Sequence, residues 1–199
     1  MAHLVSTGEL NVSQKILALD VAGTPRKWIE MEIAVHYYVK DMVAWSIGAT
    51  EFTYHGGIAR ASGERSIIVA NSIIAVRGPE FKMRNGPHVP QITKDALLER
   101  DRHMCAYCGG RFKRSELDCE HVTPLSKGGG NKWMNLVTAC KRCNHHKRNR
   151  TPEEAGMPLL YLPYIPNRHE HFILSNRNIL ADQMEYLMAS VPRHSRLHA

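Results

Sequence analysis

The sequence lacks long apolar runs. No stretch approaches about 18 uninterrupted apolar residues, so no membrane-spanning helix is predicted. The first residues, MAHLVSTGELNVSQK, have no apolar core behind a basic flank, so they do not predict a secretory signal peptide. Internal repeats and low-complexity tracts are also missing. With 43% hydrophobic residues, the chain is expected to be globular rather than disordered.

Cysteine is scarce as well. Only five cysteines occur in 199 residues, and four of them form two tight Cys-x-x-Cys pairs. Such pairs favour metal binding in a reducing compartment over a disulfide framework. We therefore expect a cytoplasmic protein.

Acidic residues are outnumbered by basic ones. The chain has 26 Lys and Arg against 19 Asp and Glu, a formal net charge of +7. This balance suits a polyanionic partner, but it favours nucleic acid only weakly because many basic proteins bind none. The length of 199 residues fits one large domain or two small ones.

Hydrophobic patterning predicts a chain that mixes helices and strands. We expect strands where β-branched or aromatic residues run together, at residues 15–21, 51–55 and 66–76. We expect helices where apolar residues recur at helical spacing or follow a capping residue, at residues 28–45, 93–102 and 169–189. The last part of the range 28–45 could equally begin a strand.

Polar, Pro and Gly signals divide these elements. Residues 1–14 are interpreted as a polar lead-in and residues 82–92 as a linker. Thr151 followed by Pro152 and two Glu residues predicts the start of a short helix. Residues 159–166, LLYLPYIP, are interrupted by Pro and predict an extended segment over the core.

The two cysteine pairs, Cys105 with Cys108 and Cys140 with Cys143, predict a closed tetrahedral zinc site. A single pair could equally be a redox dithiol, but neither pair follows a thioredoxin-like strand. A closed site of four thiolates stabilises the fold and takes no part in a reaction. The gap between the pairs exceeds the roughly 20 residues of common zinc sites, which indicates a hairpin inserted between them.

The expected hairpin begins with residues 117–123, LDCEHVT, which predict a strand. Within it, Cys119 is interpreted as a small buried core residue rather than a fifth metal ligand. Glu120 and His121 are adjacent, so they point to opposite faces of an unbent strand. A lone histidine is most simply a surface or core residue.

Two asparagines make His121 a candidate catalytic residue. Asn135 follows the Gly run at residues 128–130, and Asn144 comes directly after the last zinc cysteine. At these positions the sequence resembles the HNH endonuclease family, in the zinc-containing branch with two Cys-x-x-Cys pairs. The residues that carry the resemblance are Cys105, Cys108, Glu120, His121, Pro124, Ser126, Gly128, Gly129, Asn135, Leu136, Cys140, Cys143, Asn144 and Lys147.

The resemblance implies a ββα-metal fold, in which a β-hairpin packs on a helix with a catalytic divalent ion between them. It implies that His121 is the general base for the attacking water and that Asn135 braces the loop and orients His121. Glu120 and Asn144 would be ligands of the ion, expected to be Mg²⁺ or another divalent ion. A neutral imidazole can accept a proton near neutral pH, and one metal ion can stabilise the phosphate and the leaving oxygen.

This chain departs from the family pattern at Glu120, where the family more often has Asp. The longer side chain could reach the ion after a small shift, change the metal preference or leave coordination to water. Asn144 is followed by His145 and His146, which cannot both face the ion because helical neighbours differ by about 100°. For each of these two histidines, a contact near the ion or to phosphate and exposure to solvent are both left open.

Basic residues gather beside both cysteine pairs, where a shared zinc ion would bring them together. The cations expected to contact DNA phosphates are Lys141, Arg142, Lys147, Arg148 and Arg150. Arg111, Lys113 and Arg114 follow the first pair. No stretch resembles a base-reading helix, so sequence specificity is left open.

We therefore predict an α+β protein in three parts. These are an N-terminal α+β region at residues 1–92, an HNH module with a structural four-cysteine zinc site at residues 93–157, and a C-terminal helical extension at residues 158–199 that packs on both. The predicted function is a metal-dependent DNA endonuclease. The alternatives are a zinc-stabilised module that binds nucleic acid without cutting and an RNA-directed nuclease. A bacterial or phage-encoded homodimer and a larger phage or defence assembly are both left open.

Overall fold

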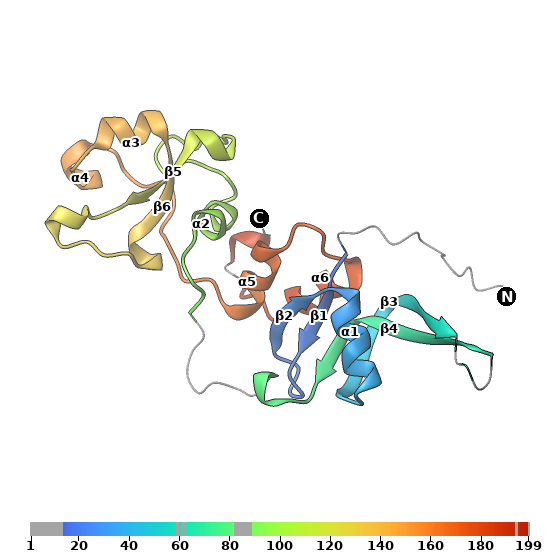
Figure 1. Cartoon of the computed structure of the whole chain (residues 1–199). Coiled ribbons are helices and arrows are strands. Elements are labelled where there is room, and N and C mark those ends of the chain that lie inside the picture. Colours follow the sequence, from blue (N-terminus) through green and yellow to red (C-terminus); the bar gives the residue numbers. More distant parts are fainter. Residues whose placement is uncertain (1–13, 59, 61–62, 82–88, 194, 199) are drawn as a thin grey trace. The chain divides into compact units, whose positions relative to one another are not determined.

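The computed structural model describes residues 14–58, 60, 63–81, 89–193 and 195–198. The chain forms two compact units (Figure 1). Unit 1 contains residues 1–86 and 176–190, and unit 2 contains residues 87–175 and 191–199. Both units combine helices with a β-sheet, which confirms the α+β class.

Unit 1 is built on a four-stranded sheet with the strand order β2-β1-β4-β3. The central strand β1 pairs antiparallel with β2 and parallel with β4, and β4 pairs antiparallel with β3. The strands are β1 (Ile16–Leu19), β2 (Pro25–Ile29), β3 (Val43–Ile58) and β4 (Arg65–Val76).

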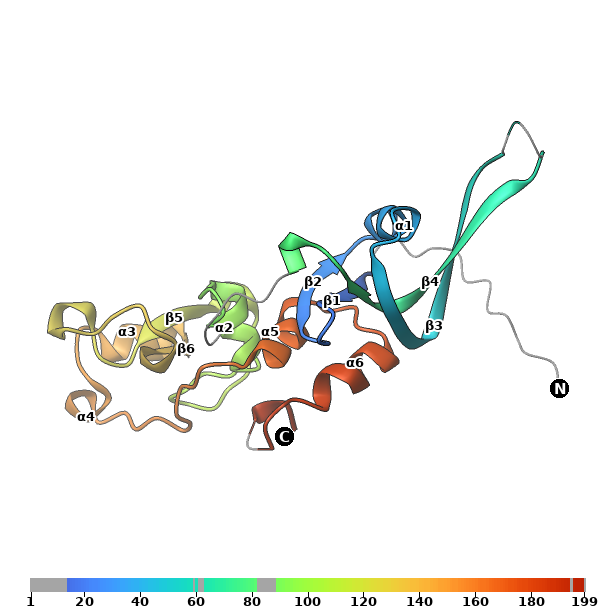
Figure 2. The same cartoon turned by 90° about the horizontal axis from the view of Figure 1, so that it is seen from below.

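Two helices lie on opposite sides of this sheet in Figure 2: α1 (Met31–Val39) and α6 (Ala181–Met188). Met31, Ala34 and Tyr37 of α1 pack on the buried apolar side chains of β1, β2 and β4. This layer is the hydrophobic core of unit 1.

Polar contacts fix α6 to the sheet. The Asp182 carboxylate accepts hydrogen bonds from the Ser72 hydroxyl at 2.7 Å and from the Thr50 backbone N–H at 2.9 Å. The Gln183 side-chain amide donates to the carbonyls of Lys15 and Ser72, both at 2.8 Å. Because Gln183 is fully buried, these bonds satisfy a side chain that would otherwise be costly to bury.

The β3–β4 hairpin extends past the rest of the sheet, as Figure 2 shows. Strand β1 pairs with only the last part of β4, at residues 73–75, so the distal half of the hairpin is a two-stranded ribbon. Ile58, Ile67 and Val69 are exposed on this ribbon.

Unit 2 is built on a two-stranded antiparallel hairpin, β5 (Leu117–His121) and β6 (Leu136–Cys140). The pairing runs from Leu117 opposite Cys140 to His121 opposite Leu136. Helices α2 (Lys94–Arg100) and α3 (Lys141–Lys147) pack on both strands. The hairpin followed by α3 is the expected ββα arrangement. Unit 2 also contains α4 (Pro152–Ala155) and α5 (Arg168–Ser175).

Two of the expected helix starts are confirmed by their caps. The Thr93 side chain accepts a hydrogen bond from the Ala96 N–H and caps α2. Thr151 and Glu154 form a reciprocal capping box at the start of α4.

The expected helix at residues 28–45 is wrong at its start, and its last part follows the strand alternative that the sequence left open. Trp28 lies on β2 opposite Leu17, α1 occupies only residues 31–39, and Val43 begins β3. The reason is the turn before β2. There the Asp20 carboxylate accepts from the N–H groups of Ala22 and Thr24 and forms an ion pair with Arg26 at 2.7 Å, which closes a β1–β2 hairpin.

The expected helix at residues 169–189 is two helices, α5 and α6. The Asn176 side chain accepts a hydrogen bond from the Asn178 N–H at 3.1 Å. This local turn competes with helical hydrogen bonds and ends α5. The two helices then belong to different units, α5 to unit 2 and α6 to unit 1.

The expected lead-in at residues 1–14 and linker at residues 82–92 lie largely outside the described residues. The division at residues 92 and 157 stays a prediction. Of the expected extension at 158–199, residues 176–190 group with unit 1 and the remainder with unit 2. Within the described residues, no helix is long and apolar enough to cross a membrane.

Candidate functional site

The four paired cysteines converge in unit 2. The sulfur atoms of Cys105, Cys108, Cys140 and Cys143 all lie within 4.8 Å of one another. A tetrahedral zinc ion with Zn–S bonds of about 2.3 Å would place its thiolates about 3.8 Å apart, so this donor set fits zinc. Among the described residues, no other group of three or more His, Cys, Asp or Glu side chains is gathered in this way.

Backbone hydrogen bonds shape the first cysteine turn. The Cys105 N–H donates to the Gly110 carbonyl at 2.9 Å, and the Gly109 N–H donates to the Cys105 carbonyl at 3.0 Å. Gly109 has a φ of +72°, which a residue with a side chain rarely adopts. The Ala106 N–H donates to the Thr138 carbonyl of β6 at 2.8 Å, which ties the turn to the hairpin.

The cysteine thiols differ in their tendency to ionise. Burial raises the pKa of Cys140 and Cys143. Burial acts in the same direction on Cys105, but backbone N–H donors outweigh it and lower the pKa of that thiol. A metal ion must therefore displace protons from at least two buried thiols, and its affinity will rise with pH.

Cys119 is not part of this cluster. It lies on β5 and packs against the buried Leu97, Trp133 and Leu136, and burial raises the pKa of its thiol. These contacts agree with the expected core role. Together with His121, it lines a largely apolar hollow of about 750 Å³.

His121 is the last residue of β5. Its Nε2 atom lies 2.7 Å from Oδ1 of Asn131, in the loop that joins the two strands. An amide oxygen only accepts hydrogen bonds, so in the tautomer that forms this bond Nε2 carries the proton and Nδ1 is left without one. Sequence reasoning missed Asn131, which no motif position distinguishes from other loop residues.

Asn135 closes the loop that leads away from His121. Its side-chain oxygen accepts from the Thr123 N–H at 2.9 Å, and its amide nitrogen donates to the carbonyls of Thr123 and Gly130 at 3.0 Å each. Its own carbonyl accepts from the Val122 N–H at 2.9 Å. A Cβ atom at Gly129 would lie 1.8 Å from the Thr123 carbonyl oxygen, so only glycine fits this turn.

Glu120 and Lys147 form a buried ion pair between β5 and α3. The Lys147 Nζ lies 2.6 Å from Oε1 of Glu120 and also donates to the His121 carbonyl at 2.9 Å. The Lys147 side chain is fully buried, and Glu120 is almost so. The expectation that Lys147 contacts DNA phosphates is therefore wrong, because its charge already neutralises Glu120 inside the module.

Asn144 lies on α3, one helical turn before Lys147. Its Nδ2 donates to Oδ2 of Asp118 at 3.3 Å, and the other oxygen of Asp118 is 3.7 Å from Lys94. Asp118 precedes Glu120 by two positions on β5, so both carboxylates point toward α3. The period of the strand could have revealed Asp118 from the sequence, but sequence reasoning did not single it out.

The other basic residues around the second cysteine pair are more accessible than Lys147. Lys141, Arg142 and Arg148 are exposed, and Arg150 is half-buried and donates to the carbonyls of His146 and Lys147. A hollow of about 680 Å³ is lined by Arg142, His145, His146, Arg148, Asn149 and Arg150. Beside the first pair, Arg114 is held by Asp95 at 2.5 Å.

Comparison with known proteins agrees with this geometry. The family model described as HNH endonuclease matches residues 105–160, which include the four cysteines, the hairpin and α3. The expected resemblance to the HNH endonuclease family is therefore confirmed for this part of the chain.

Two relatives resemble part of the chain. Over 71 residues, the chain is 30% identical to the CRISPR-associated endonuclease Cas9 of Corynebacterium diphtheriae, a match that covers 35% of this chain and 6% of the relative. Over 70 residues, it is 33% identical to the CRISPR-associated endonuclease Cas9 of Campylobacter jejuni, covering 32% and 7%. The chain thus matches a small part of each relative's length.

Proposed function

We propose that this protein is a metal-dependent endonuclease that hydrolyses phosphodiester bonds of DNA. The observation that carries the proposal is the orientation of His121, whose Nε2 is held by Asn131 at the end of the hairpin. This contact leaves Nδ1 to accept a proton from a water molecule that attacks the phosphate. The match of residues 105–160 to the HNH endonuclease family supports the same assignment.

Asn135 keeps this base in place. Three hydrogen bonds of its side chain hold both ends of the loop that begins after His121. The loop also contains Asn131, so the orientation of the imidazole depends on the loop conformation. Asn135 therefore contributes to the reaction by positioning and not by transferring a proton.

Two carboxylates and one amide between β5 and α3 offer oxygen atoms of the kind that a divalent ion binds. Oxygen atoms of Asn144, Glu120 and Asp118 would hold it, and Mg²⁺ prefers such ligands. Asn144 uses its amide nitrogen for Asp118, which leaves its oxygen as the ligand atom, and Lys147 contacts only one oxygen of Glu120. When bound, the ion would stabilise the charge that develops on the phosphate and the leaving oxygen.

The exposed cations of α3 and the following turn would bind the nucleic acid backbone. The exposed Arg142 and Arg148 and the half-buried Arg150 border one hollow next to α3, and phosphate contacts from such residues do not depend on base sequence. His145 and His146 line the same hollow, and phosphate contacts from them are part of the proposal. The net charge of +7 favours a polyanionic substrate.

The proposal is tested by nicking of supercoiled plasmid with the zinc-loaded protein. Wild type should convert the plasmid to open circles when Mg²⁺ is added and not when it is left out. His121→Ala should lower the rate by about 100-fold or more, the usual contribution of a general base. His36→Ala is the matched control, because His36 is an exposed histidine on α1 of unit 1.

Equal rates for wild type and His121→Ala would overturn the assignment of His121 as the base. Binding of plasmid without any nicking would favour the non-cutting alternative. The same assay on RNA of matched length separates a DNA nuclease from an RNA-directed one.

A further inference from the structure

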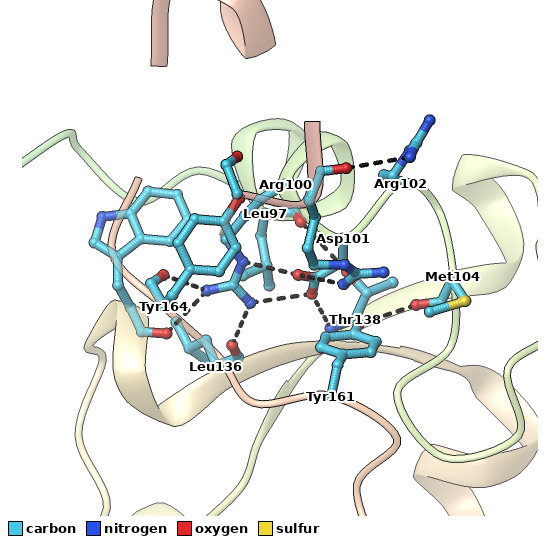
Figure 3. A network of polar contacts seen from close by, with 12 residues as sticks. Leu97, Arg100, Asp101, Arg102, Met104, Leu136, Thr138, Tyr161 and Tyr164 are labelled. Carbon is cyan, nitrogen blue, oxygen red and sulfur yellow. Dashed lines mark hydrogen bonds and ion pairs between the residues drawn. The ribbon is translucent and has the colours of Figure 1, made fainter. Parts of the chain in front are cut away.

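Arg100, at the end of α2, is a buried cation with every donor satisfied. Its residue exposure is 1%, and its five N–H groups each have an acceptor (Figure 3). Two bonds go to the carboxylate of the neighbouring Asp101, at 2.8 and 3.1 Å. The other three go to the backbone carbonyls of Leu136, Tyr164 and Trp133, at 2.7, 2.9 and 3.0 Å.

Aromatic rings enclose the same guanidinium. Its central carbon lies 5.4 Å from the centre of the Trp133 ring and 5.5 Å from that of Tyr164. Figure 3 shows the hydrogen bonds that converge on this side chain. A lysine cannot replace this arrangement, because its ammonium is a single point and cannot reach acceptors in several directions.

Two of the carbonyls that Arg100 binds belong to residues on either side of Asn135. Trp133 and Leu136 bracket the short turn on which Asn135 lies, so the guanidinium fixes both ends of that turn. Asn135 in turn holds the carbonyls of Thr123 and Gly130. Two sets of hydrogen bonds, joined by the backbone of residues 133–136, therefore connect Arg100 to the loop that orients His121.

We infer that Arg100 is a positioning residue for the phosphodiester hydrolysis proposed above, acting on His121 through Asn135. The inference rests on the proposed function. It explains why a buried cation stands here, where apolar residues of similar volume would often give equal or greater stability. Arg100 sets the position of the Asn135 turn, and Asn135 transmits that position to the loop.

The test is a double-mutant cycle on plasmid nicking, with kcat and KM measured for zinc-loaded proteins. Arg100→Lys should lower kcat by roughly 100-fold, as a displacement of about 1 Å at a reacting group can do, and leave KM within about twofold. Asn135→Ala should also lower kcat. The double variant should be no slower than the slower single variant, because both residues act along one path.

Arg26→Lys is the matched control. Arg26 also forms a buried ion pair, with Asp20 at 2.7 Å, but it lies in unit 1. Its replacement should lower stability and leave kcat unchanged. If Arg100→Lys does not fold, Arg100→Met with Asp101→Asn replaces it, because this pair removes both charges and keeps an acceptor for the Thr138 N–H.

Three results would overturn the inference. A folded Arg100 variant with wild-type kcat would show that the guanidinium does not position the base. If the fold-decreases in kcat of the Arg100 and Asn135 single variants multiplied in the double variant, the two residues would act independently. A wild-type protein that cuts no nucleic acid would overturn the proposed function together with this inference, whereas the first two results leave the proposed function intact.

Discussion

At the scale of single residues, the ion pair of Glu120 and Lys147 explains how a carboxylate can lie under the hairpin. Burying an unpaired carboxylate is costly, and here the Lys147 ammonium lies 2.6 Å from it. The same ammonium binds the His121 carbonyl, so one side chain joins α3 to the end of β5. A lysine that looks like a phosphate contact in the sequence is therefore an internal counter-ion.

Replacing Lys147 with methionine should destabilise unit 2 by about 3–5 kcal/mol, because it leaves the Glu120 charge buried without its partner. The free energy of unfolding from urea titration of the zinc-loaded protein measures this. Lys141→Met is the matched control, since Lys141 is exposed on the same helix.

Adding Glu120→Leu to Lys147→Met should restore most of the lost stability, because both charges are then gone. An equal loss in the single and the double variant would contradict the ion-pair account. It would indicate instead that the lysine stem or its bond to the His121 carbonyl provides the stability.

At the scale of secondary structure, the elements predicted best are those fixed by local chemistry. Thr93 and Thr151 cap α2 and α4 as expected, and the two cysteine pairs converge as their spacing predicts. The errors arise where a side chain makes a local turn that hydrophobic spacing does not reveal. Asp20 closes the β1–β2 hairpin and so places Trp28 on a strand.

The candidate site shows the same limit. Its motif residues could be located from the sequence, but their partners could not, because Asn131 and Asp118 become relevant only through contacts across a loop and between elements. Arg100 is a stronger example. Its three carbonyl acceptors lie 33, 36 and 64 positions away, and no local pattern connects them.

Helix α5 gives unit 2 a dependence on pH. Burial lowers the pKa of His169 and of His171 below the usual value of 6.5, and the neighbouring Arg168 adds to the effect. Below pH 6.5 the unfolded chain therefore binds more protons than the folded unit, so stability falls as pH decreases toward the lowered pKa values. Urea midpoints of zinc-loaded protein between about pH 7.5 and 5.5 should decrease accordingly.

In the double variant His169→Gln, His171→Gln, the urea midpoint should decrease less over the same pH range. Protonation of the zinc cysteines also acts at low pH, but it is common to both proteins and cancels in the comparison. If the urea midpoints of the two proteins decreased equally with pH, the histidines of α5 would not contribute to the pH dependence.

At the scale of the whole molecule, the two units are stabilised in different ways. Unit 1 has a sheet covered by α1, with an apolar core drawn from several strands. Unit 2 has a hairpin and short helices whose buried residues include three of the four clustered cysteines. A metal ion in the cysteine cluster is thus expected to contribute much of the folding free energy of unit 2.

Removing zinc with a strong chelator should unfold unit 2 and leave unit 1 folded. Hydrogen exchange should become fast at residues 94–147 and stay slow in β1, β4 and α1. The free energy of a structural zinc site, about 10 kcal/mol or more, is comparable to the whole stability of a small domain.

Cys143→Ser should have the same effect as the chelator, and Cys119→Ser should bind zinc as wild type does, since Cys119 lies outside the cluster. If unit 2 kept its protection from hydrogen exchange after zinc was lost, the metal ion would not be what holds unit 2 folded.

The place of α6 in the chain has a consequence for how the protein can be divided. Residues 176–190 belong to unit 1 although residues 87–175 and 191–199 belong to unit 2. A chain broken between residues 86 and 87 would therefore leave α6 on the second fragment, with its Asp182 and Gln183 contacts directed at the sheet of the first. The two fragments have the properties of a split protein, in which a helix carried by one half completes the sheet of the other. Substitutions at the α6 contacts would then change how tightly the halves reassemble, without altering any residue of the cysteine cluster or the hairpin.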